Sequence, residues 1–380
     1  MKILRHLELS GYKSIKNVQL DLFPGINILI GQNGSGKSNL LNFIKLLEED
    51  VLDLDSDYKV LVEWSSGDDI YKKELEQVHS TAGTSIFANL DMDIAALKSR
   101  KEIKGKISKN KSIVFESSVI GVNKYKANLT NEVENNDELE LNFSIELIDF
   151  YNKKQMPFLS NPADSELSYD GAIGVFSLNI PFGPSLAFTL GTMSEAGGFS
   201  RDIVHDHFSI YLRALLNFVK EYSPVQDVRL KDIFKISEGS EIKTIENVQL
   251  EFLVSDSWYK WDQLSDGTRR ILTIIDSVYH ATDIILIEEP ELGIHPHQLS
   301  QLLDFLAEMS EKKQIIISTH SPDVLDSIGI DSLEKINIVE MNSGQTTVHK
   351  LTDEQKEKAK IYYDETGTIG DYWKHSDLEI

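Results

Sequence analysis

The sequence predicts an α/β fold with a mainly parallel central sheet. Four short runs are almost entirely apolar and rich in isoleucine: residues 26–30, 284–287, 315–317 and 336–339. Helical segments separate the last three runs. Near-continuous buried strands that alternate with helices are what a parallel sheet covered on both faces requires. A glycine-rich turn follows the first run and leads into a helix from Ser38, which adds a strand–turn–helix junction.

Composition and charge narrow the class of protein. The 380 residues are 41% hydrophobic and 26% charged, which is ordinary for a globular protein of two domains or one enlarged domain. No cysteine is present, so disulfide scaffolds, thiolate catalysis and cysteine zinc sites are excluded. Without an 18-residue apolar run or a signal-like start, we expect a cytoplasmic protein that has no membrane partner. The net charge of −23 argues against nucleic acid as the default partner.

The pattern along the chain predicts four regions. Residues 1–80 begin with alternating apolar and polar positions and hold the glycine-rich turn, so we expect a β-rich first lobe. Short alternating segments, such as Val60–Trp64 and Leu139–Phe143, continue to about residue 180, and we assign 81–200 to a mixed α/β insertion. One amphipathic helix over 201–222 opens a second lobe, 201–351. Residues 352–380 are polar and predict a tail.

The glycine-rich turn is a complete phosphate-binding motif. Residues 31–38 match G-x-x-x-x-G-K-[ST] between a predicted strand and a predicted helix, the context that supports such a match. Glycines let backbone N–H groups surround phosphate oxygens, and the helix N-terminus adds positive potential. We expect Lys37 to reach the β- and γ-phosphates of ATP and the Ser38 hydroxyl to bind Mg²⁺. The predicted nucleotide-binding residues are Gly31, Gln32, Asn33, Gly34, Ser35, Gly36, Lys37, Ser38 and Asn39.

The order of the downstream motifs distinguishes among P-loop proteins. Residues 264–268, Leu-Ser-Asp-Gly-Thr, precede an apolar helix, and the strand over 284–287 ends in Glu288 and Glu289. The strand over 315–317 leads into Thr319 and His320. This order resembles the ABC-type ATPases of the Rad50, SMC and RecF kind, and most closely the OLD-like ATPases of phage-defence systems of the Septu and PARIS type. The resemblance covers residues 1–50 and 258–350 and implies hydrolysis of ATP to ADP and phosphate.

The resemblance implies that two chains share each ATP site. Ser265 and Gly267 correspond to the signature motif, which in this family caps the γ-phosphate of a nucleotide held by the other subunit. The implied assembly is a homodimer or a higher even oligomer. Taken alone, residues 264–268 would be an ordinary helix start. Lys13, in the turn over 11–14, corresponds to a basic residue that often touches nucleotide, and Gln155 is a candidate for the Q-loop glutamine.

The catalytic residues follow from the same resemblance. Glu288 corresponds to the Walker B acid that holds Mg²⁺ through water, here glutamate in place of the more frequent aspartate, and Glu289 to the general base. His320 corresponds to the switch histidine that contacts the γ-phosphate. Each of these residues alone is common by chance. Together, and each at the carboxyl end of a predicted strand, they predict one catalytic site.

By resemblance, the setting is bacterial defence against phage, with this ATPase as a sensor or scaffold for a separate effector. OLD-like relatives often continue into a TOPRIM nuclease domain, but only about 60 residues follow His320, which is short for a domain. We therefore expect any nuclease or toxin to be a separate protein. A RecF- or Rad50-like DNA repair ATPase and an ATP-clamped scaffold without turnover are the alternatives.

One basic stretch interrupts this acidic chain. It could follow the phosphates of a nucleic acid or form an ordinary solvated face, and the overall charge favours the solvated face. The stretch contains Lys98, Arg100, Lys101, Lys104, Lys106, Lys109 and Lys111, with only Glu102 between them.

Overall fold

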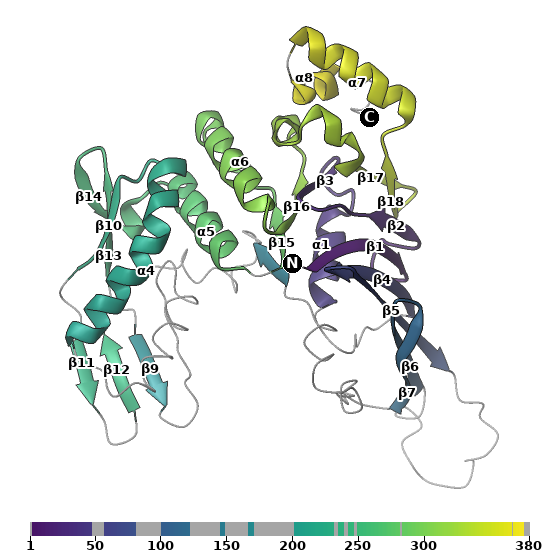
Figure 1. Cartoon of the computed structure of the whole chain (residues 1–380), viewed down its shortest axis with the longest axis horizontal. Coiled ribbons are helices and arrows are strands. Elements are labelled where there is room, and N and C mark those ends of the chain that lie inside the picture. The colour runs from purple at the N-terminus through teal and green to yellow at the C-terminus, as the bar shows by residue number, and fades with distance from the viewer. Residues whose placement is uncertain are drawn as a thin grey trace. The chain divides into compact units, whose positions relative to one another are not determined.

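The structure, a computed structural model, describes residues 2–47, 57–80, 100–121, 145–148, 166–170, 201–231, 235–238, 242–246, 249–281, 283–366 and 368–375. The chain divides into two units (Figure 1). Unit 1 comprises Met1–Leu147, Thr282–Glu289 and Ser310–Ile380, and unit 2 comprises Ile148–Ala281 and Pro290–Met309. Much of 81–200 lies outside the described residues, so the predicted region boundaries stay a prediction. In the ranges given above, no helix has the length and apolar character needed to cross a membrane.

The central sheet of unit 1 is mainly parallel, as the sequence predicts. Its order is β18-β17-β3-β16-β15-β8. The four predicted runs are β3 (Ile26–Ile30), β15 (Ile284–Glu288), β16 (Gln314–Thr319) and β17 (Ile336–Asn342), and they pair in parallel. At the edges lie β18 (Gln345–Lys350), antiparallel to β17, and β8 (Ile145–Ile148). Every residue of β3, β15 and β16 is buried, which explains why these runs lack polar alternation.

A second sheet of unit 1 is antiparallel and has the order β2-β1-β4-β5-β6-β7. Its strands are β1 (Lys2–Ser10), β2 (Val18–Asp21), β4 (Tyr58–Ser66), β5 (Asp69–Ser80), β6 (Arg100–Lys109) and β7 (Ser112–Gly121). The predicted alternating segment Val60–Trp64 lies in β4, whereas Leu139–Phe143 falls outside the described residues.

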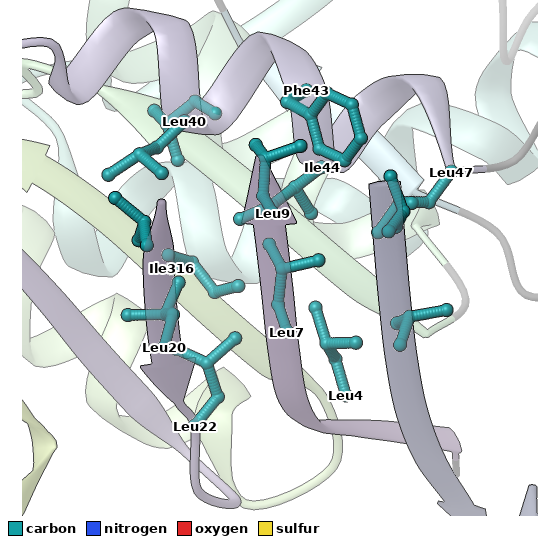
Figure 2. Packing of buried hydrophobic residues seen from close by; sticks show 14 of the residues in the cluster. Leu4, Leu7, Leu9, Leu20, Leu22, Leu40, Phe43, Ile44, Leu47 and Ile316 are labelled. Carbon is teal, nitrogen blue, oxygen red and sulfur yellow. The ribbon is translucent and has the colours of Figure 1, made fainter. Parts of the chain in front are cut away.

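Helix α1 (Lys37–Leu46) joins the two sheets of unit 1 into one core. Figure 2 shows Ile44 of α1 packed against Leu9 of β1. On the central sheet, Ile316 belongs to the same cluster, so the helix that follows the P-loop is held from both sides. Burying a side chain of this size contributes about 1.5–3 kcal/mol. The position of the P-loop is therefore fixed by packing that begins one turn after it.

A buried amide also connects the sheets. The Gln314 side chain of β16 accepts a hydrogen bond from the N–H of Leu4 and donates to the Leu4 carbonyl, both at 2.8 Å. It donates to the Phe23 carbonyl as well, at 3.0 Å. Gln314 is fully buried, so losing these partners would leave polar atoms unsatisfied at a cost of about 1–3 kcal/mol each.

Unit 2 is built around three helices. They are α4 (Arg201–Tyr222), as predicted, α5 (Asp266–His280) and α6 (Pro296–Ser310). The Phe218 ring of α4 lies 5.5 Å from the Tyr279 ring and 5.6 Å from the Phe305 ring, so an aromatic cluster joins all three helices. Two small antiparallel sheets complete the unit: β10 (Asp227–Leu230), β13 (Leu250–Val254) and β14 (Ser257–Lys260), and β11 (Lys235–Glu238), β12 (Ile242–Glu246) and β9 (Glu166–Asp170). A short 3-10 helix, η2 (Trp261–Gln263), precedes α5.

The polar region after β18 contains two helices. Two 3-10 helices, η3 (Pro322–Ser327) and η4 (Ile330–Lys335), follow β16, and α7 (Asp353–Thr366) and α8 (Ile369–His375) follow β18. The sequence predicts only a tail over these last residues. Yet Ile369 is 2% exposed and Trp373 is 6% exposed, so α8 has its own packed contacts within unit 1.

Candidate nucleotide-binding site

The P-loop runs from the end of β3 into α1, and its glycines are required by the backbone. Gly36, the residue before α1, has φ of 104° and Gly34 has φ of 82°, in the left-handed region where L side chains are strained. A Cβ added at Gly36 would lie 2.0 Å from the Thr346 hydroxyl oxygen, and one at Gly31 would lie 2.0 Å from the Val339 carbonyl oxygen. The loop is thus pressed against β17 and β18.

Lys37 is folded onto the loop that it terminates. Its ammonium group donates to the carbonyls of Gly31 at 2.7 Å and Gln32 at 2.9 Å, and the residue is 5% exposed. The Ser35 hydroxyl is also buried and has no hydrogen-bond partner in the described part of the chain. A buried cation and an unsatisfied hydroxyl, in a loop that starts a helix, suit a phosphate ligand.

A network of three hydroxyl and amide groups holds the first turn of α1. The Ser14 and Thr346 hydroxyls lie 2.7 Å apart, and the Asn39 amide donates to Ser14 at 2.9 Å. Asn39, predicted to touch nucleotide, therefore also connects α1 to the N-terminal turn. Lys13 lies in that turn with φ of 49°, and its ammonium group sits 5.1 Å from the Tyr12 ring centroid. It is exposed and makes this cation–π contact.

The acidic residues and the histidine gather at the carboxyl ends of β15 and β16. The Ser38 hydroxyl donates a hydrogen bond to the Glu288 carboxylate, so the fold brings two side chains that are 250 positions apart into contact. The additional methylene of glutamate therefore does not prevent this contact. Next in the chain, the Glu289 backbone has φ of 45°, and its N–H donates to the Ser318 carbonyl at 2.8 Å. Non-glycine residues in this conformation are uncommon and concentrate at functional sites.

His320 completes this cluster. Its Nδ1 atom lies 3.4 Å from the nearer carboxylate oxygen of Glu289. The histidine side chain is 37% exposed and that of Glu289 is 14% exposed, so the pair has one face toward solvent. The structure thus brings together Lys37, Ser38, Glu288, Glu289 and His320 within unit 1.

The residues present fit a Mg²⁺–nucleotide. Hydroxyl and carboxylate oxygens are the ligands that Mg²⁺ prefers, and Ser38 and Glu288 supply one of each side by side. Of the two left-handed glycines before α1, Gly36 has no room for a Cβ, because Thr346 lies against it. This donor set and this cradle agree with the sequence-based prediction of ATP and Mg²⁺.

The predicted signature residues begin α5 in unit 2. The Ser265 hydroxyl accepts a hydrogen bond from the Thr268 N–H at 3.1 Å, so Ser265 is the N-cap of the helix, the ordinary role considered above. Ser265 is exposed, whereas Gly267 is buried, and a Cβ at Gly267 would lie 2.6 Å from the Gly293 carbonyl oxygen. Beside them, the Arg270 guanidinium donates to the Leu292 carbonyl. The start of α5 is therefore bound to the loop over 290–295.

Some contacts of the site could not be read from the sequence. Thr346 lies in a hairpin with no motif, and Ser318 acts through its backbone carbonyl. The only signal for Ser14 is its place beside Lys13. Gln155 lies outside the described residues.

The basic stretch is part of a mixed-charge sheet face. In the register of β5 and β6, Lys104 lies opposite Glu76 and Lys106 opposite Glu74. Lys109 lies 3.1 Å from Asp69 in an ion pair. A hydrogen bond from Lys72 and the nearby Lys106 hold the pKa of Glu74 below its usual value. These cross-strand acids support the solvated-face interpretation. Lys98 is outside the described residues.

Two family matches cover most of the chain. Residues 1–170 match a family described as an AAA ATPase domain, and residues 210–326 match one described as an AAA domain, putative AbiEii toxin, Type IV TA system. Among solved structures, the SMC head bound to the C-winged helix domain of ScpA has a TM-score of 0.50 and 14% identity, over 93% of this chain and 99% of that one. The predicted ABC-type P-loop fold is confirmed.

Curated relatives are similar over shorter stretches. The DNA replication and repair protein RecF of Lactococcus lactis subsp. cremoris is 29% identical over 99 residues, 26% of this chain and 28% of the relative. RecF of Heliobacterium modesticaldum is 36% identical over 61 residues, which are 16% of this chain and 16% of the relative. RecF of Limosilactobacillus fermentum is 49% identical over 45 residues, which are 12% of this chain and 12% of the relative. The chain thus spans less than a third of these relatives. Both matched families are described as ATPase domains, and the likeness to RecF is confined to these short stretches.

Proposed function

We propose that the chain binds ATP with Mg²⁺ on the P-loop of unit 1 and hydrolyses it to ADP and phosphate. The observation that carries this proposal is the cluster of Ser38, Glu288, Glu289 and His320 at the carboxyl edge of the central sheet. Ligands of α/β sheets bind at this edge.

Each side chain of the cluster has a task in that reaction. Lys37 and the loop N–H groups hold the phosphates, and Ser38 with Glu288 would hold the metal. When bound, Mg²⁺ neutralises charge on the phosphate oxygens. Glu289 accepts the proton of the attacking water, because its carboxylate lies beside His320 at the edge of the sheet and is partly exposed. His320 orients this carboxylate and contacts the γ-phosphate.

Turnover requires two chains. Ser265 and Gly267 open a helix N-terminus, where free N–H groups and the dipole favour phosphate, and Ser265 is exposed. In the proposed dimer, Ser265 of one chain meets the nucleotide on the P-loop of the other. ATP binding then closes the pair and hydrolysis reopens it.

Phosphate release by the purified chain tests the reaction. Glu289→Gln should lower kcat by about 10²–10⁴-fold, the usual contribution of a general base, and leave ATP bound. Lys37→Ala should abolish ATP binding. Glu311→Gln, at an exposed position after α6, is the matched control and should behave as wild type. If the wild-type chain releases no phosphate while Lys37→Ala abolishes assembly, the chain is an ATP-clamped scaffold and the enzymatic proposal is wrong.

A mixing experiment tests the shared site. Ser265→Arg and Lys37→Ala chains should each be inactive alone. In an equal mixture, half of the dimers are mixed and each has one intact site, so roughly a quarter of wild-type activity should return. No recovery, or a monomer at saturating ATP, would refute the shared site.

We further propose that this ATPase senses infection or scaffolds a separate nuclease or toxin in bacterial phage defence. The motif order and the toxin–antitoxin description of one matched family support this setting. The RecF relatives favour a second candidate, an ATPase of DNA repair. Duplex binding that weakens steeply with salt would favour repair. A nuclease or toxin gene beside this one would favour defence.

A further inference from the structure

Helix α8 is docked on η3, which begins two residues after His320. The chain leaves β16 at Thr319, passes through His320 and Ser321, and enters η3 at Pro322. The Ser321 N–H donates to the Thr319 hydroxyl at 2.9 Å, so this short link is held in place on the side of β16. Pro322 has a fixed φ, which leaves little freedom between the histidine and η3.

The contact between α8 and η3 is a close approach of two backbones. A Cβ added at Gly370, the second residue of α8, would lie 2.6 Å from the Pro322 carbonyl oxygen. Real Cβ atoms do not come this close, so any other residue at 370 must push the helix and Pro322 apart. Pro322 is only two residues from His320.

Hydrogen bonds fix the same contact. One carboxylate oxygen of Asp326 accepts the N–H groups of Ile369 and Gly370, both at 2.9 Å. Burial raises the pKa of Asp326, and these two N–H groups act in the opposite direction because they stabilise its charged form. Lys374, at the other end of α8, donates to Asp323 at 2.6 Å. Both ends of α8 are therefore bound to η3.

We propose that α8 is a clamp that positions His320, with Gly370 and Asp326 as its positioning residues. Docking of α8 sets where Pro322 lies, and through Ser321 it sets where the imidazole meets Glu289. This inference rests on the proposed function, since it needs ATP turnover that uses His320. It adds that turnover depends on the docking of α8.

A double-mutant cycle in the full chain tests the clamp. Gly370→Ala should lower kcat roughly tenfold or more and change the KM for ATP less than about twofold, because small misplacements of a catalytic group are costly. In a His320→Ala background, where single-turnover measurements report the residual rate, Gly370→Ala should have no further effect. Gly329→Ala is the matched control, because a Cβ there meets nothing within 4 Å.

Asp326 supplies a second, milder pair of variants. Asp326→Ala removes the acceptor for both N–H groups and should reproduce the kcat loss, whereas Asp326→Asn keeps an acceptor oxygen and should restore most of the rate. This pair decides the matter if Gly370→Ala does not fold. Equal losses in the His320 and His320→Ala backgrounds would overturn the clamp, as would a folded Gly370→Ala with wild-type kcat. If His320→Ala itself keeps wild-type kcat, the assigned role of His320 fails and the clamp fails with it.

Discussion

Gly36→Ala should destabilise unit 1 by an amount that separates into two contributions. An alanine with φ of 104° is strained by about 1–2 kcal/mol, the cost of the left-handed region. Its Cβ would also lie 2.0 Å from the Thr346 hydroxyl oxygen, and overpacking of this kind costs about 1–3 kcal/mol. The expected loss in the free energy of unfolding is the sum, about 2–5 kcal/mol.

Two further variants separate these contributions. Thr346→Ala removes the two closest atoms, the hydroxyl oxygen at 2.0 Å and the methyl carbon at 2.9 Å, but loses the hydroxyl contact with Ser14, which is worth about 0.5–1.5 kcal/mol. The double variant should therefore be more stable than the sum of the single losses predicts, by about 1–3 kcal/mol. Gly34→Ala is the matched control: its φ is 82°, but a Cβ there meets nothing within 4 Å. It should show the dihedral cost alone and no coupling to Thr346→Ala.

The assay is urea unfolding, with hydrogen exchange of peptides from β3 and α1 as the local readout of unit 1. ATP binding by each folded variant is measured beside it. If Gly36→Ala and Gly34→Ala cost the same, or if Thr346→Ala adds to Gly36→Ala without coupling, the close approach of β18 to the P-loop is not the cause and the reasoning is refuted.

Three further perturbations test other parts of the molecule. Arg270→Ala removes the hydrogen bond to the Leu292 carbonyl that binds the start of α5 to the loop over 290–295, so it should misplace Ser265 and lower kcat about tenfold with ATP binding unchanged. Arg213→Ala, at an exposed position, is the control and should keep the wild-type kcat; equal kcat values for the two variants would contradict the prediction. Burial lowers the pKa of His6, but hydrogen bonds to Asp21 and Glu8 outweigh burial and raise it above 6.5. The stabilisation from the charged imidazole is therefore complete below pH 6.5 and is lost as the pH rises through the raised value, so the urea midpoint of wild type should fall over this range and that of His6→Gln should not. Because Lys106 lies opposite Glu74, Lys106→Gln should leave the retention of duplex DNA unchanged at every salt concentration. If the variant's DNA affinity depends less steeply on salt than that of wild type, the basic stretch follows nucleic-acid phosphates after all.

The parts that the sequence predicts are those whose signal is local. The runs at 26–30, 284–287 and 315–317 are buried on both faces, so their shortness and their high content of isoleucine identify them as strands. The P-loop motif and the helical periodicity over 201–222 can likewise be recognised from consecutive residues, without knowledge of distant partners. The convergence of Ser38 with Glu288 follows once β3 and β15 are taken as strands of one parallel sheet, in which β16 lies between them.

The parts that the sequence does not predict depend on distant partners. Nothing near Thr346 indicates that its hydroxyl faces Ser14 or that it limits residue 36 to glycine. Helix α8 has too few turns for a clear period, and its stability comes from Asp326 and from burial of Trp373. Lys104 and Lys106 of β6 lie opposite acids of β5, which a count of lysines in one segment does not reveal.

The place of β3 between β16 and β17 has a consequence for biosynthesis. Both hydrogen-bonding neighbours of the strand that leads into the P-loop are translated some 290 to 310 residues after it. A nascent chain therefore leaves the ribosome with both edges of β3 exposed, and such edges can pair with other chains until the last third is made. The nucleotide site can consequently form only after β16 and β17 have been synthesised, late in translation.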